Sequence, residues 1–457
     1  MPGKQIEGLF RRSSSLVPTP SLFDALTIFF GLSGRDIHIF NHDRISAYEA
    51  SVGFYTDHPD VSRRIMEHQR RDFAQYLQGR NLVFLSNLIL RANVEALYGE
   101  HLLRICPSFC QDFWNFYKAF PNIFKGLPRW FVPSSYQARD EMHKSFDRWR
   151  TWCSENYNWD NDGLRDIEYE PIWGTQYVRK MIQRHEALGL SNNGVTVVML
   201  GYFFVAMANT VPAALWMIVH ILLDASLLRR VRHQISFAFQ STEVGEQPDI
   251  KVLMKDPLLN SIYYETLRLR VASTVGRTSL DDQLCLAGGW KVKAGVPVMF
   301  TGWLAGLDVS CWNTGQDLSS GKPQHPLEAF WAERFLDCPG SSSISGPAKK
   351  KRVQPARESP QRPTTHMGTE DERSRASVAG LRGHFFPFGG GAFRCPGETL
   401  AKQVIFASIA MVLQSYDLRL IDPEEARKIE PGHRELPFGL HSFDRPVPVE
   451  ICKLSET

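Results

Sequence analysis

The chain has 457 residues, of which 43% are hydrophobic and 22% charged, so general disorder is excluded. The formal net charge is only +3, which gives no general argument for nucleic-acid binding. Eight cysteines are scattered along the chain without a CxxC pair, which argues against a disulfide scaffold and a structural zinc site. The polar start indicates neither a signal peptide nor an N-terminal anchor.

The first half of the chain is predicted to be mostly helical. A helix is expected from Pro59 to Leu77 and another over Asn87 to Tyr98. Residues 100–190 are rich in aromatic side chains at helical spacing. Residues 1–55 are mixed and offer no two clear strands.

Residues 196–223 contain no Asp, Glu, Lys or Arg. Their length would allow them to cross a bilayer. Asn209, Thr210, Pro212 and His220 lie inside the segment, however, so a long buried helix in a globular domain is the alternative. The segment alone does not separate these two interpretations.

A helix is predicted from Pro257 to about Arg270, because proline suits the first helical position. Residues 284–300 then read as short strands joined by glycine turns. Together these patterns predict a mainly α fold with a small β lobe. Residues 340–379 combine serines, prolines and basic residues, and are predicted to be a disordered insert. The run Lys349–Arg352 is interpreted as a solvated charge run, with a nuclear-import signal as the alternative.

The strongest chemical signal is the segment from Phe388 to Gly397, which reads Phe-Gly-Gly-Gly-Ala-Phe-Arg-Cys-Pro-Gly. Consecutive glycines let the backbone approach a large flat group without Cβ clashes. Cys395 stands just ahead of a predicted helix, where the helix dipole is expected to favour the thiolate. A thiolate on a glycine-rich loop suits axial ligation of haem iron.

This segment resembles the haem-binding loop of cytochrome P450s through five positions: Phe388, Gly389, Gly391, Cys395 and Gly397. The resemblance extends from about residue 60 to 451. It implies one cytochrome P450 domain over residues 1–457 that binds haem (iron protoporphyrin IX), with Cys395 as the iron ligand. It also implies that the family's N-terminal anchor and first helix and strands are missing from this chain.

Two further segments match the family in the expected order. Glu265 lies on an apolar helical stripe, where a carboxylate needs a partner, and Arg268 follows one turn later. This pair resembles the Glu-x-x-Arg of the P450 K helix. Residues 330–335 resemble the Pro-Glu-Arg-Phe segment, with alanine in place of proline. The resemblance implies that Arg334 completes a structural cluster with Glu265 and Arg268.

The resemblance also assigns basic residues to the haem propionates. Phe393 stands where the family often has a basic residue, so Arg277, in the strand after the K helix, is the better candidate. Arg70 and Arg71 are weaker candidates. Near the C-terminus, Leu436–His441 resembles the hairpin that lines the substrate pocket.

Ala206-Met-Ala-Asn-Thr-Val-Pro212 lies where P450s place their oxygen-activating helix. Asn209 replaces the usual acid, and the combination resembles the group containing cholesterol 7α-hydroxylase, prostacyclin synthase and related fungal enzymes. Because Pro212 has no N–H and its ring clashes with the carbonyl of Ala208, the helix is predicted to open near Thr210. By resemblance, Thr210 and Asn209 organise proton delivery, and residues 196–223 form a core helix.

The implied function is haem-thiolate monooxygenation of a lipophilic small molecule, such as a sterol, a terpenoid or another secondary metabolite. Electrons would come from NADPH-cytochrome P450 reductase, and no nucleic acid is expected as a partner. The implied location is the endoplasmic reticulum membrane, with peripheral contact. Asn209 motivates an alternative, a haem-thiolate isomerase or dehydratase. The short N-terminal part motivates another, a non-catalytic truncated remnant.

Overall fold

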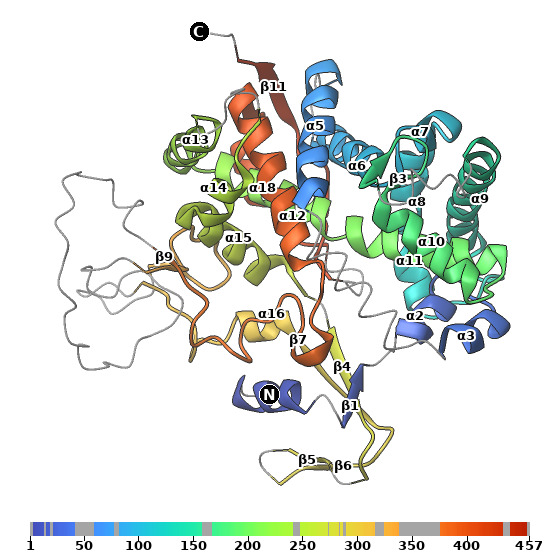
Figure 1. The fold of residues 1–457 in the computed structure, drawn as a ribbon. Coiled ribbons are helices and arrows are strands. Elements are labelled where there is room, and N and C mark those ends of the chain that lie inside the picture. Colours follow the sequence, from blue (N-terminus) through green and yellow to red (C-terminus); the bar gives the residue numbers. More distant parts are fainter. Residues whose placement is uncertain are drawn as a thin grey trace.

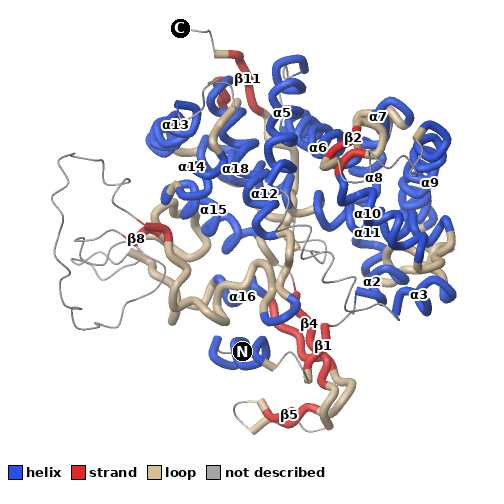
Figure 2. The backbone as a smooth tube through the Cα atoms, viewed as in Figure 1, coloured by secondary structure: helices blue, strands red, loops and turns tan. Residues whose placement is uncertain are grey.

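The computed structural model describes residues 3–12, 15–18, 22–41, 59–76, 82–157, 167–240, 247–272, 274–282, 284–286, 289–315, 324–337, 375–432 and 439–454. Helices make up most of these residues, and the strands form small sheets; β1, β4 and β5 lie near the lower edge of the view, and β11 lies at the top beside the C-terminus (Figures 1 and 2). The predicted mainly α fold with a small β lobe is confirmed.

The helices of the first half are α1 (Gly3–Arg11), α2 (Leu22–Ile28), α3 (Gly34–Asn41), α5 (Pro59–Tyr76), α6 (Leu82–Tyr98), α7 (His101–Ile105), α8 (Phe109–Phe124), α9 (Pro133–Asn156), α10 (Gln176–Ala187), α11 (Asn192–Met207) and α12 (Thr210–Leu222). The later helices are α13 (Ala225–Gln240), α14 (Ile250–Lys255), α15 (Pro257–Arg270), α16 (Gly302–Gly306), α18 (Glu398–Ser415) and α19 (Pro423–Arg427), with a 3-10 turn, η2 (Gly391–Phe393). The helices predicted from Pro59 and over Asn87–Tyr98 are confirmed as α5 and α6.

The main sheet has three antiparallel strands in the order β1 (Leu16–Pro18), β4 (Thr274–Ser279), β7 (Pro297–Thr301). The described residues before Asn41 therefore contribute one strand, which pairs Leu16 with Ser279 and Pro18 with Arg277. Proline is tolerated there because β1 is an edge strand. The remaining strands form two-stranded sheets: β2 (Tyr169–Glu170) with β3 (Gly174–Thr175), β5 (Leu284–Cys285) with β6 (Lys291–Val292), β8 (Leu336–Asp337) with β9 (Arg375–Ala376), and β10 (Tyr416–Leu420) with β11 (Val449–Lys453).

The long apolar segment is a core helix in two parts. Residues Asn192–Leu222 are apolar and long enough to cross a membrane, but 78% of their most apolar stretch is buried inside the protein. The buried side chains of α11 belong to one hydrophobic core, with α6, α8 and α9, while those of α12 belong to a second core, with α15 and α18. The break between α11 and α12 at Ala208–Asn209 therefore lies where the two cores meet, and the predicted opening near Thr210 is confirmed.

Helix α15 begins and ends as the sequence predicts. Asp256 caps it by accepting a hydrogen bond of 2.7 Å from the backbone N–H of Leu259, and Pro257 occupies the first turn. Its buried side packs against α12, α14 and α16, which places the Glu265 face inside the protein.

Most of the predicted insert, residues 340–374, lies outside the described residues. Residues 375–379 are described, and Arg375–Ala376 form β9 opposite β8. Regular structure therefore resumes before residue 379, because Asp337 and Leu336 offer β9 a hydrogen-bonded partner.

Candidate active site

The glycine-rich loop presents Cys395 ahead of α18. Gly389 and Gly391 both have φ of 71°, a left-handed conformation that favours glycine. The loop is closed by a hydrogen bond of 2.9 Å from the Cys395 backbone N–H to the Phe388 carbonyl. Cys395 is exposed, so its thiol is available to a ligand.

The thiol has an unexpected electrostatic environment. Desolvation by neighbouring protein raises the pKa of Cys395 above its ordinary value, although a hydrogen bond from the Gly397 backbone opposes this. Arg394 also opposes it, but Arg394 is held in a two-pronged ion pair with Glu398 at 2.7 and 2.8 Å. The helix dipole is expected to lower the pKa of Cys395. For the protein without haem this expectation is wrong, because desolvation of the thiol outweighs the groups that lower its pKa.

Arg277 reaches this loop from β4. Its side chain is buried, and Nη2 donates a hydrogen bond of 3.1 Å to the Gly390 carbonyl while Nη1 donates to Gly276 at 2.9 Å. The rings of Phe10 and Phe393 lie 5.6 and 5.8 Å from the guanidinium carbon. The structure thus places a buried cation against the loop, at the residue preferred from the sequence.

Helix α1 packs directly against the loop, as the dark-blue N-terminal helix in Figure 1 shows. A Cβ added to Gly390 would lie 2.7 Å from the Phe10 ring, and one added to Gly391 would lie 2.4 Å from the Phe10 carbonyl oxygen. This contact was missed at the sequence level. The apolar spacing of Ile6, Leu9 and Phe10 indicated a buried helix face, but not its partner.

Glu265, Arg268 and Arg334 meet in one buried cluster. The Glu265 carboxylate accepts hydrogen bonds from Arg268 Nε and Nη2 at 2.7 and 2.8 Å, and from Arg334 Nε at 2.9 Å. All three charged side-chain ends are fully buried. Burial alone would raise the pKa of Glu265, but the two guanidinium groups outweigh it and hold the pKa below its ordinary value.

The same guanidinium groups bind the backbone of the segments 306–315 and 324–331 and hold them against α15. Arg268 donates to the carbonyls of Gly306 and Leu327 at 2.8 and 2.7 Å. Arg334 donates to the carbonyls of Asn313, Pro326 and Ala329, and the Trp331 N–H donates to Glu265 at 3.2 Å. Sequence reasoning missed these acceptors, because a backbone carbonyl leaves no signature in residue type.

Thr210 and Asn209 lie at the helix break. The Thr210 hydroxyl donates a hydrogen bond of 2.8 Å to the Ala206 carbonyl, which is left at the opened end of α11. Four residues at helical spacing before Thr210 are accessible. Val205 is 43% exposed, and Tyr202, Ala206 and Asn209 are partly exposed, although neighbouring positions of α11 are buried. This accessible stripe (Tyr202, Val205, Ala206 and Asn209) gives the middle of the molecule an open face beside Thr210.

The weaker propionate candidates have other partners. Arg71 is paired with Asp72, Glu95 and Glu100 along α5, α6 and the start of α7. Arg70 is exposed on α5. Of the three arginines considered from the sequence, Arg277 is therefore the one that the structure places against the Cys395 loop.

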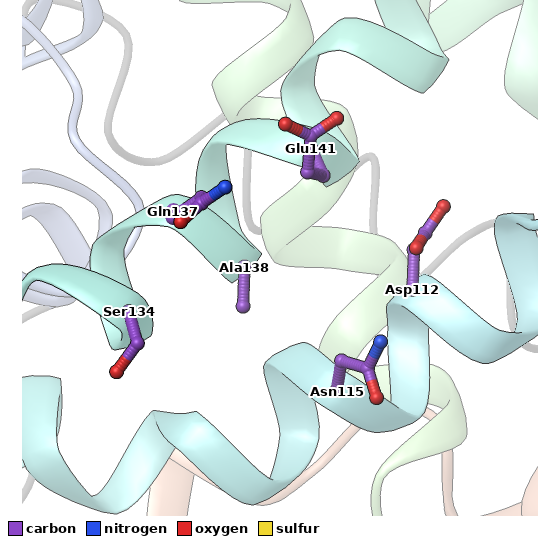
Figure 3. A pocket seen from close by; sticks show the side chains of 6 residues that line it. All are labelled: Asp112, Asn115, Ser134, Gln137, Ala138 and Glu141. Atoms are coloured by element: carbon purple, nitrogen blue, oxygen red, sulfur yellow. The ribbon is translucent and has the colours of Figure 1, made fainter.

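A pocket of about 260 Å³ lies between α8 and α9, where the side chains of the two helices face each other (Figure 3). It is lined mainly by polar groups: Asp112, Asn115, Ser134, Gln137, Ala138 and Glu141. Such a lining does not suit a lipophilic molecule, and none of these residues belongs to the Cys395 loop. This pocket is therefore separate from the candidate active site.

The residues around Cys395 fit a haem group. In the described part of the chain, no group of three or more His, Cys, Asp or Glu side chains is arranged to hold a metal ion, whereas ligation of haem iron by the protein requires only one thiolate, such as that of Cys395. The thiol is exposed on a glycine backbone, and Arg277 places a positive charge against the same loop. These are the iron ligand and the cation that a haem with propionates requires.

Comparison with known proteins agrees with this chemistry. The cytochrome P450 family model matches residues 96–326 and 359–442. The chain is 32% identical over 346 residues to the cytochrome P450 monooxygenase fsoE of Humicola fuscoatra, covering 74% of this chain and 56% of that protein. It is 31% identical over 378 residues to efuG of Hormonema carpetanum, covering 81% and 63%. Cytochrome P450 7A1 of Oryctolagus cuniculus is 22% identical over 354 residues, covering 74% and 60%.

The chain thus spans about three fifths of the length of the two fungal relatives. The family match includes both the helix that carries Thr210 and the loop that carries Cys395. Recognition of the family from its loop and its Glu-x-x-Arg pair is confirmed, and the chain belongs to the haem-dependent cytochrome P450 family.

Proposed function

We propose that this chain is a single-domain haem-thiolate monooxygenase that inserts one oxygen atom from O2 into a lipophilic small molecule. The observation that carries the proposal is the exposed Cys395 thiol on its glycine-rich loop. A sterol, a terpenoid or another secondary metabolite is the proposed substrate class, and NADPH-cytochrome P450 reductase the proposed electron donor. The similarity to fungal P450 monooxygenases supports the chemistry.

Each proposed site residue has one task. Haem bound at Cys395 would supply the activation of dioxygen. Arg277 would neutralise a propionate, and Phe388, Gly389, Gly391 and Gly397 would shape the loop around Cys395. The Thr210 hydroxyl would hold and transfer a proton at Oγ1, since its bond to Ala206 keeps it at the opened end of α11. The cluster of Glu265, Arg268 and Arg334 would keep the segment behind the loop in place.

Ligation by Cys395 is tested by the spectrum of the reduced protein under carbon monoxide. The haem-loaded protein should give the red-shifted Soret band of thiolate ligation, and Cys395→Ala should lose it. Retention of that band in Cys395→Ala would show that Cys395 is not the ligand. The buried Cys153→Ala is the matched control and should keep the band.

Monooxygenation is tested by turnover with the reductase and isotopically labelled O2. NADPH consumption should depend on the substrate, and one labelled oxygen atom should enter the product. Thr210→Ala should uncouple NADPH consumption into peroxide release, because the hydroxyl that transfers the proton is removed. The conservative Thr210→Ser should restore coupling.

A haem-thiolate isomerase or dehydratase is the second candidate. One observation favours it: the position before Thr210 carries an amide, and the Asn209 Oδ1 already accepts a hydrogen bond from the Leu440 N–H at 2.8 Å. An enzyme that rearranges a peroxide needs no proton relay at this position. Rearrangement or dehydration of a peroxide substrate without O2 and NADPH, together with no substrate-dependent consumption of NADPH in the presence of O2 and reductase, would establish this candidate and rule out the monooxygenase.

We also propose peripheral contact with the endoplasmic reticulum membrane through the segment between α8 and α9. Trp130 and Phe131 are 81% and 62% exposed there, and Lys125 and Arg129 are exposed beside them. Exposed aromatic rings beside basic side chains suit the interface of an anionic bilayer. Trp130→Ser with Phe131→Ser should reduce cosedimentation with phosphatidylserine-containing vesicles. Trp290→Ser, which removes a ring that is 74% exposed elsewhere, should not.

A further inference from the structure

Asn209 is placed like a helix cap but does not act as one. It occupies the N-cap position of α12, yet its side chain makes no capping hydrogen bond. An asparagine at this position ordinarily accepts a hydrogen bond from the second or third residue of its helix. The third residue here is Pro212, which has no N–H to donate. Proline thus removes one of the usual local partners, and the Asn209 oxygen is directed elsewhere.

The partner of that oxygen is distant in sequence. Asn209 Oδ1 accepts a hydrogen bond of 2.8 Å from the backbone N–H of Leu440. Leu440 is only 5% exposed, so its N–H has little access to water as a substitute partner. A buried N–H that loses its acceptor is costly. The carboxamide of Asn209 therefore satisfies a backbone group that apolar surroundings would otherwise leave unpaired.

The neighbouring residue is shaped to admit the Asn209 carboxamide. Gly439 has φ of 110°, and a Cβ added to it would lie 2.2 Å from Asn209 Oδ1 and 2.9 Å from Nδ2. Both the backbone angle and the space therefore require glycine. Two residues that are far apart in the chain are thus matched in shape as well as in hydrogen bonding.

The other side of this turn, Gly439–His441, is held by α15 and α12. The Ala272 N–H donates to the Gly439 carbonyl and the His441 N–H donates to the Arg270 carbonyl, both at 2.9 Å. The Trp216 indole N–H donates to the His441 carbonyl at 2.8 Å. Among these hydrogen bonds, the one from the Leu440 N–H to Asn209 joins the turn to the break between α11 and α12.

The position of the turn relative to the open face of α11 gives the bond its significance. Asn209 is the last member of the accessible stripe, and Thr210 follows it directly. A shift of the turn would therefore change the space beside the stripe and next to the Thr210 hydroxyl. A side chain can thus control which ligands fit without touching them.

We propose that Asn209 is a positioning residue whose side-chain oxygen fixes the Gly439–His441 turn against the helix break and thereby sets the shape of the lipophilic pocket. The pocket part of this inference rests on the proposed haem-thiolate function. The hydrogen bond itself does not, so the two parts are tested by separate measurements.

The first measurement is hydrogen exchange on the haem-free protein. Asn209→Leu keeps the approximate size of the side chain but removes the acceptor, so exchange at the Leu440 amide should accelerate at least tenfold. Asn209→Asp keeps an acceptor oxygen and should restore protection. The Ala213 amide, which donates to the Asn209 backbone carbonyl at 3.1 Å, is the internal reference and should stay unchanged. Unchanged protection of Leu440 in Asn209→Leu would overturn the proposal.

The second measurement is spectral titration of the haem-loaded ferric protein with imidazole and with 4-phenylimidazole, which differ by an apolar ring. Asn209→Leu should change the Kd of 4-phenylimidazole at least fivefold and that of imidazole less than twofold, while Asn209→Asp should leave their ratio unchanged. Neither titration involves O2 or proton delivery. Wild-type affinity for both probes in Asn209→Leu, together with NADPH uncoupling, would assign Asn209 to proton delivery and overturn the positioning role.

Gly439→Ala provides an independent approach from the other side of the contact. The added methyl group would displace the Asn209 carboxamide, so this variant should also lose protection at Leu440 and change the same Kd ratio. If it leaves both unchanged, the proposal fails even where Asn209→Leu does not fold. If the protein shows no thiolate spectrum, the proposed haem function fails, whereas the exchange result still decides whether Asn209 fixes the turn.

Discussion

Arg277 and Gly390 are joined by a hydrogen bond of 3.1 Å, from the guanidinium Nη2 on β4 to a backbone carbonyl of the Cys395 loop. The Phe10 ring of α1 and the Phe393 ring of the loop also lie near the guanidinium carbon of Arg277. The β lobe is therefore connected to the loop through a side chain that also carries the positive charge of the site. A change in β4 would therefore reach the Cys395 loop through the Arg277 side chain.

Glu265→Gln should strongly destabilise the protein. The substitution keeps the shape of the side chain but leaves Arg268 and Arg334 buried without a neutralising charge. Breaking such a buried pair costs about 3–5 kcal/mol, which urea unfolding would measure. The control is Glu425→Gln, which breaks an exposed pair with Lys428 and should cost less than about 1 kcal/mol. Equal losses in the two variants would show that the buried cluster has no special role.

His143 on α9 should make stability depend on pH. Desolvation, reinforced by Arg139, lowers its pKa from 6.5 to about 4. The unfolded chain therefore binds more protons between these values, so the contribution of His143 is fully present above pH 6.5 and is lost as the pH falls toward 4. The loss should reach about 3 kcal/mol.

Urea midpoints at several pH values would measure this effect. His143→Gln should flatten the curve between pH 6.5 and 4, while Lys144→Gln, an exposed neighbour on the same helix, should not. Superimposable curves for the wild type and His143→Gln would contradict the prediction.

Gly391→Ala should disrupt the loop more than Gly389→Ala does. Both residues have φ of 71°, so both substitutions incur the left-handed strain of about 1–2 kcal/mol. At Gly391 the new methyl group would also lie 2.4 Å from the Phe10 carbonyl oxygen, whereas at Gly389 the nearest atom is 3.8 Å away. Thermal melting and haem content of the two variants would measure the difference. Equal effects would mean that α1 moves away from the loop at little cost.

Residues 338–374 should be replaceable by an Asn-Gly turn. Asp337 lies directly opposite Arg375 in the antiparallel β8–β9 pair, which is the geometry that a two-residue hairpin turn closes. The entropic free-energy cost of closing the loop falls by about 0.6 kcal/mol for each halving of its length. Haem content should therefore persist and the melting temperature should not fall. Loss of haem would show that the replaced residues take part in the core.

Short-range patterns predicted the elements and the Glu265–Arg268 pair well. Proline at the start of α15 and the three-residue spacing of Glu265 and Arg268 depend only on local helix geometry, and both match the structure. The choice of Arg277 as a propionate candidate required the family resemblance, because β4 and the loop are separated by more than a hundred residues. Periodicity alone contains no such information.

Other features could not be predicted from the sequence. They depend on how opposing contributions to a pKa balance, or on which distant residues the fold brings into contact. The dipole argument for Cys395 considered one contribution, whereas desolvation by the folded protein outweighs it. The pairing of Arg71 with Glu95 and Glu100 requires the packing of α5 on α6. The diversion of the Asn209 oxygen to Leu440 depends on a turn that only the complete fold brings near.

The contact between Phe10 and the glycines at 390 and 391 also has a consequence for protein synthesis. Helix α1 and strand β1 are translated before β4 and the Cys395 loop, against which they pack. At about 5–20 residues per second, α1 waits on the order of 20–80 s for the loop. During that interval the part of α1 that packs against Gly390 and Gly391 lacks this native partner, so the nascent chain either exposes it or covers it with temporary contacts until the loop has been translated.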